Sequence, residues 1–463
     1  MRRPVLSVPG RGLAGLLCGA AVMVAPLAAN EPPTPRLTFG FDQRLEYIGN
    51  AGLDTPSAGR TTQSVTGLSF GLFSETPRDT LGLTGSTGFR WGDRPLGRIS
   101  DFDNTRLGLN YRREGADSEF VIGAAARRAQ IDTLRSLLDF VDEDGVLVLP
   151  EDFEDLRGVG RRTSYDVNAR LALGQTAAPF GVTFTLGAGA ILYSDGAPEA
   201  DIRTERAGVQ TRYRLSPVLT ATLGASRQRR REFTEVPQRR VTDRVDAGVI
   251  YALSPRSELQ ASLGYSRVDR TGGIVRREEG LVGSFDLGVD TPDGNYGFFF
   301  DAVQRETGQQ LSGGVRRAID LRGGAVSGSV GATRLPGGST ALTGTVSLRQ
   351  DLRDGPLTAS LSRQVGGDDL DLRTRTVARA GYTHQINSVS SFGLRGDLAR
   401  SEGTAISNQV DQGSVGLTYT HELTADWALN SGVSYRVRRE ENVGTARSPE
   451  IFIGLGRGFV FPL

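Results

Sequence analysis

The sequence contains no lysine, so all 54 of its basic residues are arginine. It has one cysteine, Cys18, which lies in the N-terminal segment described below, and two histidines, His384 and His421. Once that segment is removed, no disulfide, thiol nucleophile or zinc–thiolate site can form. The 54 arginines are balanced by 53 acidic residues, for a formal net charge of +1. This balance predicts no polybasic face and therefore no nucleic-acid partner.

Long apolar runs are also missing. Beyond the N-terminal segment no stretch of 18 apolar residues occurs, so we expect no transmembrane helix in the mature chain. Residues 1–29 carry three arginines, an apolar core over residues 12–25 and a small-residue cleavage site at residues 27–29. We therefore predict a signal peptide at residues 1–29 and a single domain over residues 30–463.

What the sequence does contain is alternation with a period of two, the spacing of a β-strand. It is clearest in residues 449–463, where bulky apolar side chains alternate with a row that is mostly glycine. The apolar row is Ile451, Ile453, Leu455, Phe459, Phe461 and Leu463. One row suits lipid and the other suits an enclosed lumen. Arg457 interrupts the apolar row, so we expect either a bulge beside it or a side chain that extends to the membrane surface.

Similar alternating blocks recur from residue 36 onward, beginning with residues 37–48, and each has roughly the length of a tilted transmembrane strand. The pattern predicts an all-β fold, a single antiparallel transmembrane β-barrel of about 22 strands (18–22) with the first strand paired to the last. An even number of strands places both termini in the periplasm. The longer and more polar connections between the blocks, including residues 228–240, are expected to be extracellular loops. Residues 308–350 are rich in glycine, and the alternation is weakest there. A soluble antiparallel β-protein would also alternate, but it would need neither a secretion signal nor an apolar closing strand.

A repeated tyrosine marks one end of several predicted hairpins. Each of these tyrosines precedes a short polar turn on the apolar row, where an aromatic girdle meets the membrane surface. The predicted girdle residues are Tyr111, Tyr213, Tyr251, Tyr382 and Tyr419. His384 and His421 belong to repeated Tyr-Thr-His tripeptides, so we interpret them as part of the girdle and not as catalytic bases. No nucleophile elbow, phosphate loop or pair of metal ligands stands out, and we predict no catalytic residue, no metal site, no cofactor and no enzymatic activity.

The largest departure from hairpin regularity is the acidic segment 132–160, which combines clustered carboxylates with apolar pieces at residues 137–138 and 146–149. One interpretation is a solvated extracellular loop. Another is a loop that folds into the barrel mouth, anchored by its apolar residues, and narrows the channel. A calcium site is a third use of such carboxylates, although no EF-hand spacing is present. The candidates for a constriction loop are Asp139, Asp142, Glu143, Asp144, Glu151, Asp152, Glu154 and Asp155.

Many arginines fall on the row opposite to the apolar row. Because an arginine facing lipid at mid-membrane would cost about 2–4 kcal/mol, we expect these side chains to line the lumen. The predicted lumen arginines are Arg44, Arg90, Arg106, Arg112, Arg127, Arg170, Arg206, Arg212, Arg214, Arg395, Arg436 and Arg438. Two interpretations stay open: charge pairs that brace the wall, or an electropositive track that favours anionic solutes.

Two resemblances add to this picture. The closing stretch resembles the C-terminal insertion signal of bacterial outer-membrane β-barrels, although it ends in Pro462-Leu463 and not in an aromatic residue. That resemblance implies the outer membrane of a Gram-negative bacterium, with lipid and the barrel assembly machinery as partners. The tyrosine-marked hairpins, over the whole mature chain, resemble the type 2 class of β-barrel porins. Some members of that class accompany exopolysaccharide systems, which implies a polysaccharide or a small polar solute as the transported partner.

We therefore predict a porin-like outer-membrane channel for passive passage or export of polar, anionic solutes, narrowed by the acidic segment. Residues 30–35 are too few to form a plug domain before the first strand, so we expect a lumen that is open or occluded by the chain's own loops. A non-conducting structural or adhesive barrel that binds partners through its loops is the alternative, and a barrel enzyme is less favoured.

Overall fold

The computed structural model describes residues 35–463 except residues 96, 132–136, 138–148, 150–152, 154–159, 175–177, 195–199, 274, 368–370 and 405–406. The predicted signal peptide lies outside the described residues. The strands are β1 (Arg36–Ile48), β2 (Thr61–Glu75), β3 (Asp79–Arg94), β4 (Gly97–Glu114), β5 (Ser118–Gln130), β6 (Arg161–Leu173), β7 (Phe180–Ser194), β8 (Ile202–Ser216), β9 (Leu219–Glu232), β10 (Gln238–Ser254), β11 (Ser257–Thr271), β12 (Arg276–Thr291), β13 (Gly294–Arg305), β14 (Gly308–Leu321), β15 (Gly324–Arg334), β16 (Thr340–Leu352), β17 (Gly355–Gly366), β18 (Arg373–Asn387), β19 (Ser390–Ser401), β20 (Val410–Glu422), β21 (Trp427–Glu440) and β22 (Gly444–Pro462).

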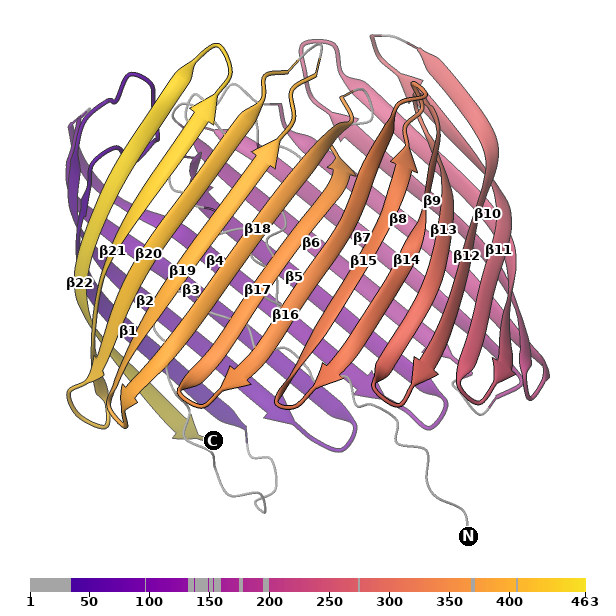
Figure 1. Ribbon diagram of the computed structural model, residues 1–463, viewed down its shortest axis with the longest axis horizontal. Coiled ribbons are helices and arrows are strands. Elements are labelled where there is room, and N and C mark those ends of the chain that lie inside the picture. Colours follow the sequence, from indigo (N-terminus) through magenta and orange to yellow (C-terminus); the bar gives the residue numbers. More distant parts are fainter. Residues whose placement is uncertain are drawn as a thin grey trace.

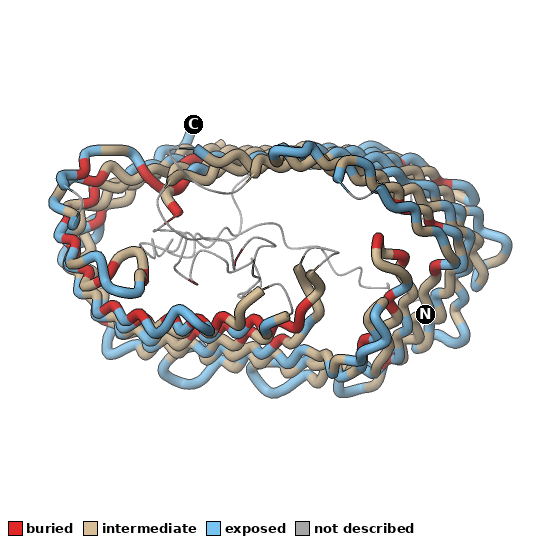
Figure 2. Tube along the Cα trace, turned by 90° about the horizontal axis from the view of Figure 1, so that it is seen from above, coloured by how far each residue is buried: buried red, intermediate tan, exposed pale blue. Residues whose placement is uncertain are grey.

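These strands form one closed antiparallel barrel (Figure 1). Each strand pairs with the next in sequence, and β1 pairs with both β2 and β22, so the sheet has no free edge. Phe39 lies opposite Phe459 in the closing pair, with the two ring centroids 6.3 Å apart. The predicted fold class, strand number and closure of the first strand on the last are confirmed. Seen from above, the barrel is an elongated ring and not a circle (Figure 2).

The two ends of the barrel differ in their connections. Both described ends of the chain, together with the turns β2–β3, β4–β5 and every second turn after them, lie at one end, which we call the turn end. The opposite end, the loop end, carries the longer connections, including residues 49–60 and 131–160. That the turn end is periplasmic stays a prediction.

Several strands extend farther toward the loop end than the apolar alternation predicts. The stretch 228–240 was expected to be a loop, whereas β9 continues to Glu232 and β10 begins at Gln238. The alternation is hidden there because arginine occupies positions on both faces of the two strands, so no apolar row marks the strand.

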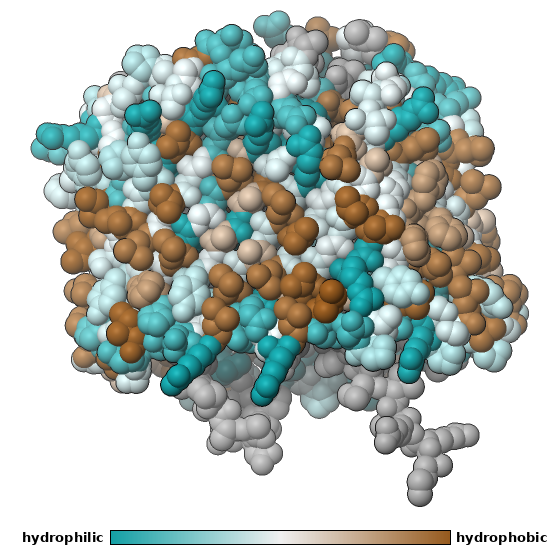
Figure 3. All heavy atoms as spheres, viewed as in Figure 1, coloured by the Kyte–Doolittle hydropathy of each residue, from teal (hydrophilic) through white to brown (hydrophobic). Residues whose placement is uncertain are grey.

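The outer face of the barrel is apolar over a broad band. Leu223, Val245, Leu263 and Leu281 are all exposed and point outward from neighbouring strands β9–β12. On the face in front in Figure 3, hydrophobic side chains spread over the middle of the barrel and hydrophilic ones gather toward the loop end. Exposed apolar side chains on this scale are the surface expected of a barrel embedded in lipid. No helix among the described residues is long and apolar enough to cross a membrane.

The glycine-rich region 308–350 contains three regular strands, β14, β15 and the greater part of β16. Small hydroxyl side chains of its inward row pair across β15 and β16: Ser327 with Ser347 at 2.6 Å and Ser329 with Thr345 at 3.0 Å. The alternation is weak in sequence because much of this inward row is glycine, alanine, serine or threonine, while the strand geometry is unaffected.

Arg457 is accommodated without a bulge. The register of β22 is continuous through this residue against both β1 and β21, with Phe41 and Trp427 as its two neighbours. Its guanidinium lies 4.5 Å from the ring centroid of Phe459 and 5.5 Å from that of Trp427, and it pairs with Asp426 at 3.2 Å. Asp426 belongs to the turn β20–β21 at the turn end. The side chain therefore reaches the membrane surface, which is the second of the two expected arrangements.

Candidate functional site

The strand register places the predicted lumen arginines on the row opposite to the exposed apolar row. On β4, for example, Leu107 is exposed to the outside while its neighbour Arg106 lies on the inward row opposite Arg127 of β5. Most of these arginines lie on one side of the elongated ring, on β1, β3–β6 and β8, and the rest on β19 and β21. The residues are Arg44, Arg90, Arg106, Arg112, Arg127, Arg170, Arg206, Arg212, Arg214, Arg395, Arg436 and Arg438.

Several of these arginines are held in ion pairs along the wall. Arg44 pairs with Glu46 at 2.6 Å, and Arg112 pairs with Glu119 of β5 at 2.7 Å. Arg90 is 6% exposed and lies 3.0 Å from Asp103, itself 3% exposed. In a buried pair of this kind each charge compensates the other, so the two side chains stay together. The bracing interpretation therefore describes this part of the wall.

Other arginines of the same row have no carboxylate partner within 4 Å in the described part of the chain. Arg206 on β8 and Arg395 on β19 have no ion pair, and the Arg212 guanidinium donates to the backbone carbonyl of Gly174 at 2.5 Å. The electropositive-track interpretation stays a prediction for these positions.

The acidic segment reaches the opposite wall of the barrel. Leu137 and Phe153 are each 1% exposed and pack against Val377, Ala399 and Val410, which are inward residues of β18, β19 and β20. Leu149 packs on the same cluster and is partly buried. We call these three wall residues the apolar anchor. The acidic segment covers this inward apolar cluster, which explains why its side chains are buried although they face the lumen.

The position of the apolar anchor shows how far the segment travels. The segment leaves β5 and returns to β6, whereas the anchor lies on β18–β20, which are separated from that hairpin by β7–β17 on one side and by β21, β22 and β1–β4 on the other. Figure 1 places β18–β20 in the front wall and β5 and β6 in the wall behind it, and Figure 2 shows these two long walls of the ring facing each other across the lumen. The chain at Leu137 and Phe153 therefore lies inside the barrel against the far wall, as the folded-in interpretation requires.

The constriction-loop candidates fall on either side of these anchoring residues. Asp139, Asp142, Glu143, Asp144, Glu151, Asp152, Glu154 and Asp155 all lie outside the described residues. Their role in narrowing the channel stays a prediction, and so does the use of their carboxylates for calcium.

A polar frame surrounds the apolar anchor. The Arg438 guanidinium of β21 lies 5.7 Å from the ring centroid of Phe153 and donates to Gln412 at 3.2 Å. Arg438, Gln412 and Glu440 are all buried. Buried polar groups need such partners, because an unsatisfied one costs free energy. The sequence placed Arg438 on the inward row but gave no sign of its contact with Phe153, because the two residues are 285 positions apart.

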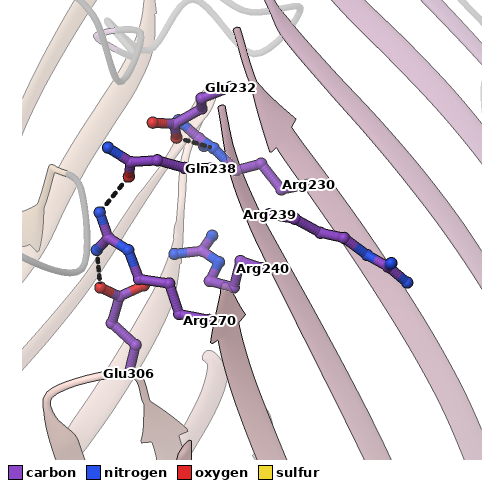
Figure 4. Close-up of a pocket in the computed structure, with 7 residues that line it drawn as sticks. All are labelled: Arg230, Glu232, Gln238, Arg239, Arg240, Arg270 and Glu306. Atoms are coloured by element: carbon purple, nitrogen blue, oxygen red, sulfur yellow. Dashed lines mark hydrogen bonds and ion pairs between the residues drawn. The ribbon is translucent and has the colours of Figure 1, made fainter. Parts of the chain in front are cut away.

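A second cluster of arginines lines the inner face of β9–β11 at the loop end (Figure 4). Arg230, Arg240 and Arg270 occupy directly paired positions on three neighbouring strands. Arg230 pairs with Glu232 at 2.8 Å, and Arg270 pairs with Glu306 and with Gln238. The sequence interpretation missed this cluster, because it assigned residues 228–240 to a loop.

The predicted girdle tyrosines all lie near the turn end on the outward row. The hydroxyl of Tyr111 donates to Asp79 at 2.7 Å, and the ring of Tyr382 lies beside His384, with its hydroxyl 3.1 Å from the Nδ1 atom. His421 Nδ1 lies 2.8 Å from the Ser390 hydroxyl. Ser390 is 5% exposed, and its contact with His421 links β19 to β20 on the outward row. Among the described residues no group of three or more histidine, cysteine or acidic side chains is placed to hold a metal ion.

Comparison with solved structures shows the fold of outer-membrane transport proteins. The chain superposes on the FrpB iron transporter from Neisseria meningitidis with a TM-score of 0.55, at 10% identity, over 93% of this chain and 83% of that one. It superposes on the ferric enterobactin receptor PfeA from Pseudomonas aeruginosa with a TM-score of 0.56, at 9% identity, over 93% and 82%. The copper transporter OprC gives a TM-score of 0.53, at 11% identity, over 93% and 81%.

These similarities are structural only. No protein-family model matches the sequence, and no curated protein sequence matches it. A closed 22-stranded barrel with an exposed apolar band, of the same fold as bacterial outer-membrane transporters, agrees with the outer-membrane location that the sequence predicts. The chain is an outer-membrane-type β-barrel.

Proposed function

We propose that the protein is a porin-like channel in the outer membrane of a Gram-negative bacterium, which passes polar, anionic solutes through an arginine-lined lumen, by passive passage or as an export route. The observation that carries this proposal is the inward row itself, where Arg206, Arg212 and Arg395 form no ion pair within 4 Å with a described residue. Cations that face an aqueous lumen favour anions over cations in the pore.

The acidic segment supplies the second part of the proposal. We propose that the segment crosses the lumen and narrows it, and the packing of Leu137 and Phe153 against the far wall supports this. Acidic side chains on that segment would face basic side chains on the wall, and the resulting transverse field would select polar solutes by dipole and size. We assign the constriction to this segment.

The structural neighbours support transport as the general role. They are an iron transporter, a receptor in complex with enterobactin and a copper transporter. The type 2 porin class, and with it a polysaccharide as solute, stays a proposal that rests on the tyrosine-marked hairpins. Recognition of the closing strand by the barrel assembly machinery and contact with outer-membrane lipid belong to the same proposal.

Single-channel recording on the refolded mature protein tests the function. We expect small, anion-selective currents from the intact barrel and larger ones after deletion of residues 139–152, which keeps Leu137 and Phe153. In the full-length barrel, Arg206→Gln with Arg395→Gln should shift the reversal potential toward cation selectivity. Arg317→Gln, at an outward position on β14 near the turn end, is the matched control and should leave selectivity unchanged.

Three outcomes would contradict parts of the proposal. If neither the intact nor the deleted barrel conducts, the channel is ruled out and the non-conducting structural or adhesive barrel is favoured. If both conduct equally, the segment is not the constriction. If the intact barrel is cation-selective, the anion preference is wrong while the channel survives.

A further inference from the structure

The outer face of β8–β12 carries three successive rows of charged side chains at the loop end, beyond the apolar band. The band ends on this face with Val245 of β10 and Tyr265 of β11, which are paired, exposed and outward. Each row is a set of directly paired outward positions. The rows therefore lie at three increasing heights above the apolar band.

The first two rows are balanced in charge. The first contains Arg227, Asp243, Arg267 and Glu279, and Arg227 pairs with Asp243 at 2.6 Å. The second contains Glu205, Arg229, Asp269 and Arg277, where Arg229 pairs with Glu205 at 3.2 Å and Arg277 with Asp269 at 3.8 Å. Alternation of sign along a row is what cross-strand pairing favours.

The third row breaks this rule. Arg203 of β8, Arg231 of β9 and Arg239 of β10 occupy directly paired positions, and none has a carboxylate within ion-pair distance among the described residues. Arg203 lies over the ring of Phe233 at 5.0 Å. Figure 4 shows Arg239 pointing away from Arg230, Arg240 and Arg270, on the other side of the sheet. We call these three residues the outer arginine row.

Three like charges at adjacent paired positions destabilise a sheet. The row is therefore favourable only if an anion lies against it, and an anion with several oxygens suits guanidinium groups best because each can accept two parallel hydrogen bonds. Phosphate groups meet this requirement. The row lies on the outside of the barrel, so the anion approaches from the membrane side and not from the lumen.

The height of the row indicates which lipid supplies the phosphate. Arg239 lies six residues beyond Val245 along β10. With a rise of ~3.3 Å per residue and a tilt of ~45°, the row lies roughly 14 Å above the end of the apolar band. The polar layer of an ordinary bilayer is only about 5–8 Å thick on each side. A headgroup that reaches this height is larger, such as a phosphorylated saccharide.

We propose that the outer arginine row binds the phosphorylated saccharide headgroup of a glycolipid in the leaflet at the loop end. The two balanced rows below it lie at the level where the membrane changes from hydrocarbon to headgroups. This site is independent of the lumen and of the channel activity proposed above.

The test uses the refolded mature barrel in neutral detergent, with rough lipopolysaccharide as the probe. Retention of the glycolipid after washing is measured by native mass spectrometry and its affinity by titration. We expect Arg203→Gln/Arg231→Gln/Arg239→Gln to weaken binding at least tenfold. The matched control, Arg227→Gln/Asp243→Asn, removes a balanced outward pair one row above the apolar band and should bind as the wild type does.

Two further arms identify the ligand. Enzymatically dephosphorylated lipopolysaccharide should bind the wild type as weakly as the intact glycolipid binds the triple variant, and millimolar inorganic phosphate should not displace the glycolipid. Wild-type retention by the triple variant, or displacement by inorganic phosphate alone, overturns the proposal. If the triple variant does not refold, Arg231→Gln alone should weaken binding severalfold, and an unchanged affinity of that variant overturns the proposal equally.

Discussion

The ring of Phe153 lies 5.7 Å beneath the guanidinium of Arg438, in a contact that joins the acidic segment to the far wall of the barrel. Phe153 is 1% exposed and Arg438 is 5% exposed. A cation over an aromatic face contributes about 0.5–2 kcal/mol, more when the pair is desolvated as it is here. With Leu137, this contact determines whether the segment stays across the lumen.

Phe153→Ala should release the segment from the apolar anchor. Truncating a buried phenylalanine costs about 3–5 kcal/mol. A loss of this size is enough to detach a segment that few contacts hold. We expect faster cleavage by an added protease between residues 138 and 152, together with higher single-channel conductance. Phe298→Ala, at an exposed outward position on β13, is the control and should change neither. Unaltered cleavage in Phe153→Ala would mean that the contact does not hold the segment.

The inward pair of Arg316 on β14 and Asp286 on β12 should show strong coupling in stability. The two side chains form a double ion pair across β13. Asp286→Asn leaves the arginine without its charge partner, so we expect a loss of about 1–3 kcal/mol in the free energy of unfolding. Arg316→Gln in the same chain should recover most of it. Urea titration in detergent of both single variants and the double variant measures this coupling, and additive losses would show that the pair does not act as a unit.

Gly331→Ala should destabilise the barrel although it adds one methyl group. A Cβ at this position would lie 2.3 Å from the carbonyl oxygen of Gly313 on β14, so the backbone must shift. We expect a loss of about 1–3 kcal/mol, as in other overpacked sites. At the inward Gly456 the nearest atoms to a Cβ are 3.8 Å away, so Gly456→Ala should stay within about 0.5 kcal/mol of wild type. Equal unfolding midpoints for the two variants would refute the close approach.

Arg457→Glu should impair membrane insertion more than Arg457→Leu. The glutamate would lie beside Asp426 and lose the stacking on Trp427 and Phe459, whereas leucine restores the apolar row of β22. An exposed ion pair contributes about 0–1 kcal/mol and a surface cation–π contact about 0.5–1 kcal/mol, so Arg457→Leu should be close to neutral. The yield of heat-modifiable, folded barrel in lipid vesicles distinguishes the two variants. A lower yield for leucine than for glutamate would contradict this account.

The sequence predicts features that depend on neighbouring residues, and it does not predict contacts between residues far apart in the chain. The outward row of residues 451–463 and the first strand could be identified directly, because side chains of a strand alternate and one face meets lipid. The strand tips at residues 228–240 were assigned to a loop, because arginine at both inward and outward positions removes the apolar signal. In residues 308–350 the signal is weak because most inward positions are glycine, alanine, serine or threonine.

The sequence by itself indicated a barrel of 18–22 antiparallel strands, the closure of β1 on β22 and the sorting of arginines to the inward row, since these follow from a local period and from the cost of charge in lipid. Only the tertiary structure decided which charges meet. The docking of Leu137 and Phe153 on Val377, Ala399 and Val410, the contact of Phe153 with Arg438, and the alignment of Arg203, Arg231 and Arg239 all depend on register and closure. Strands far apart in sequence face each other only once the barrel is closed, so no local pattern encodes these contacts.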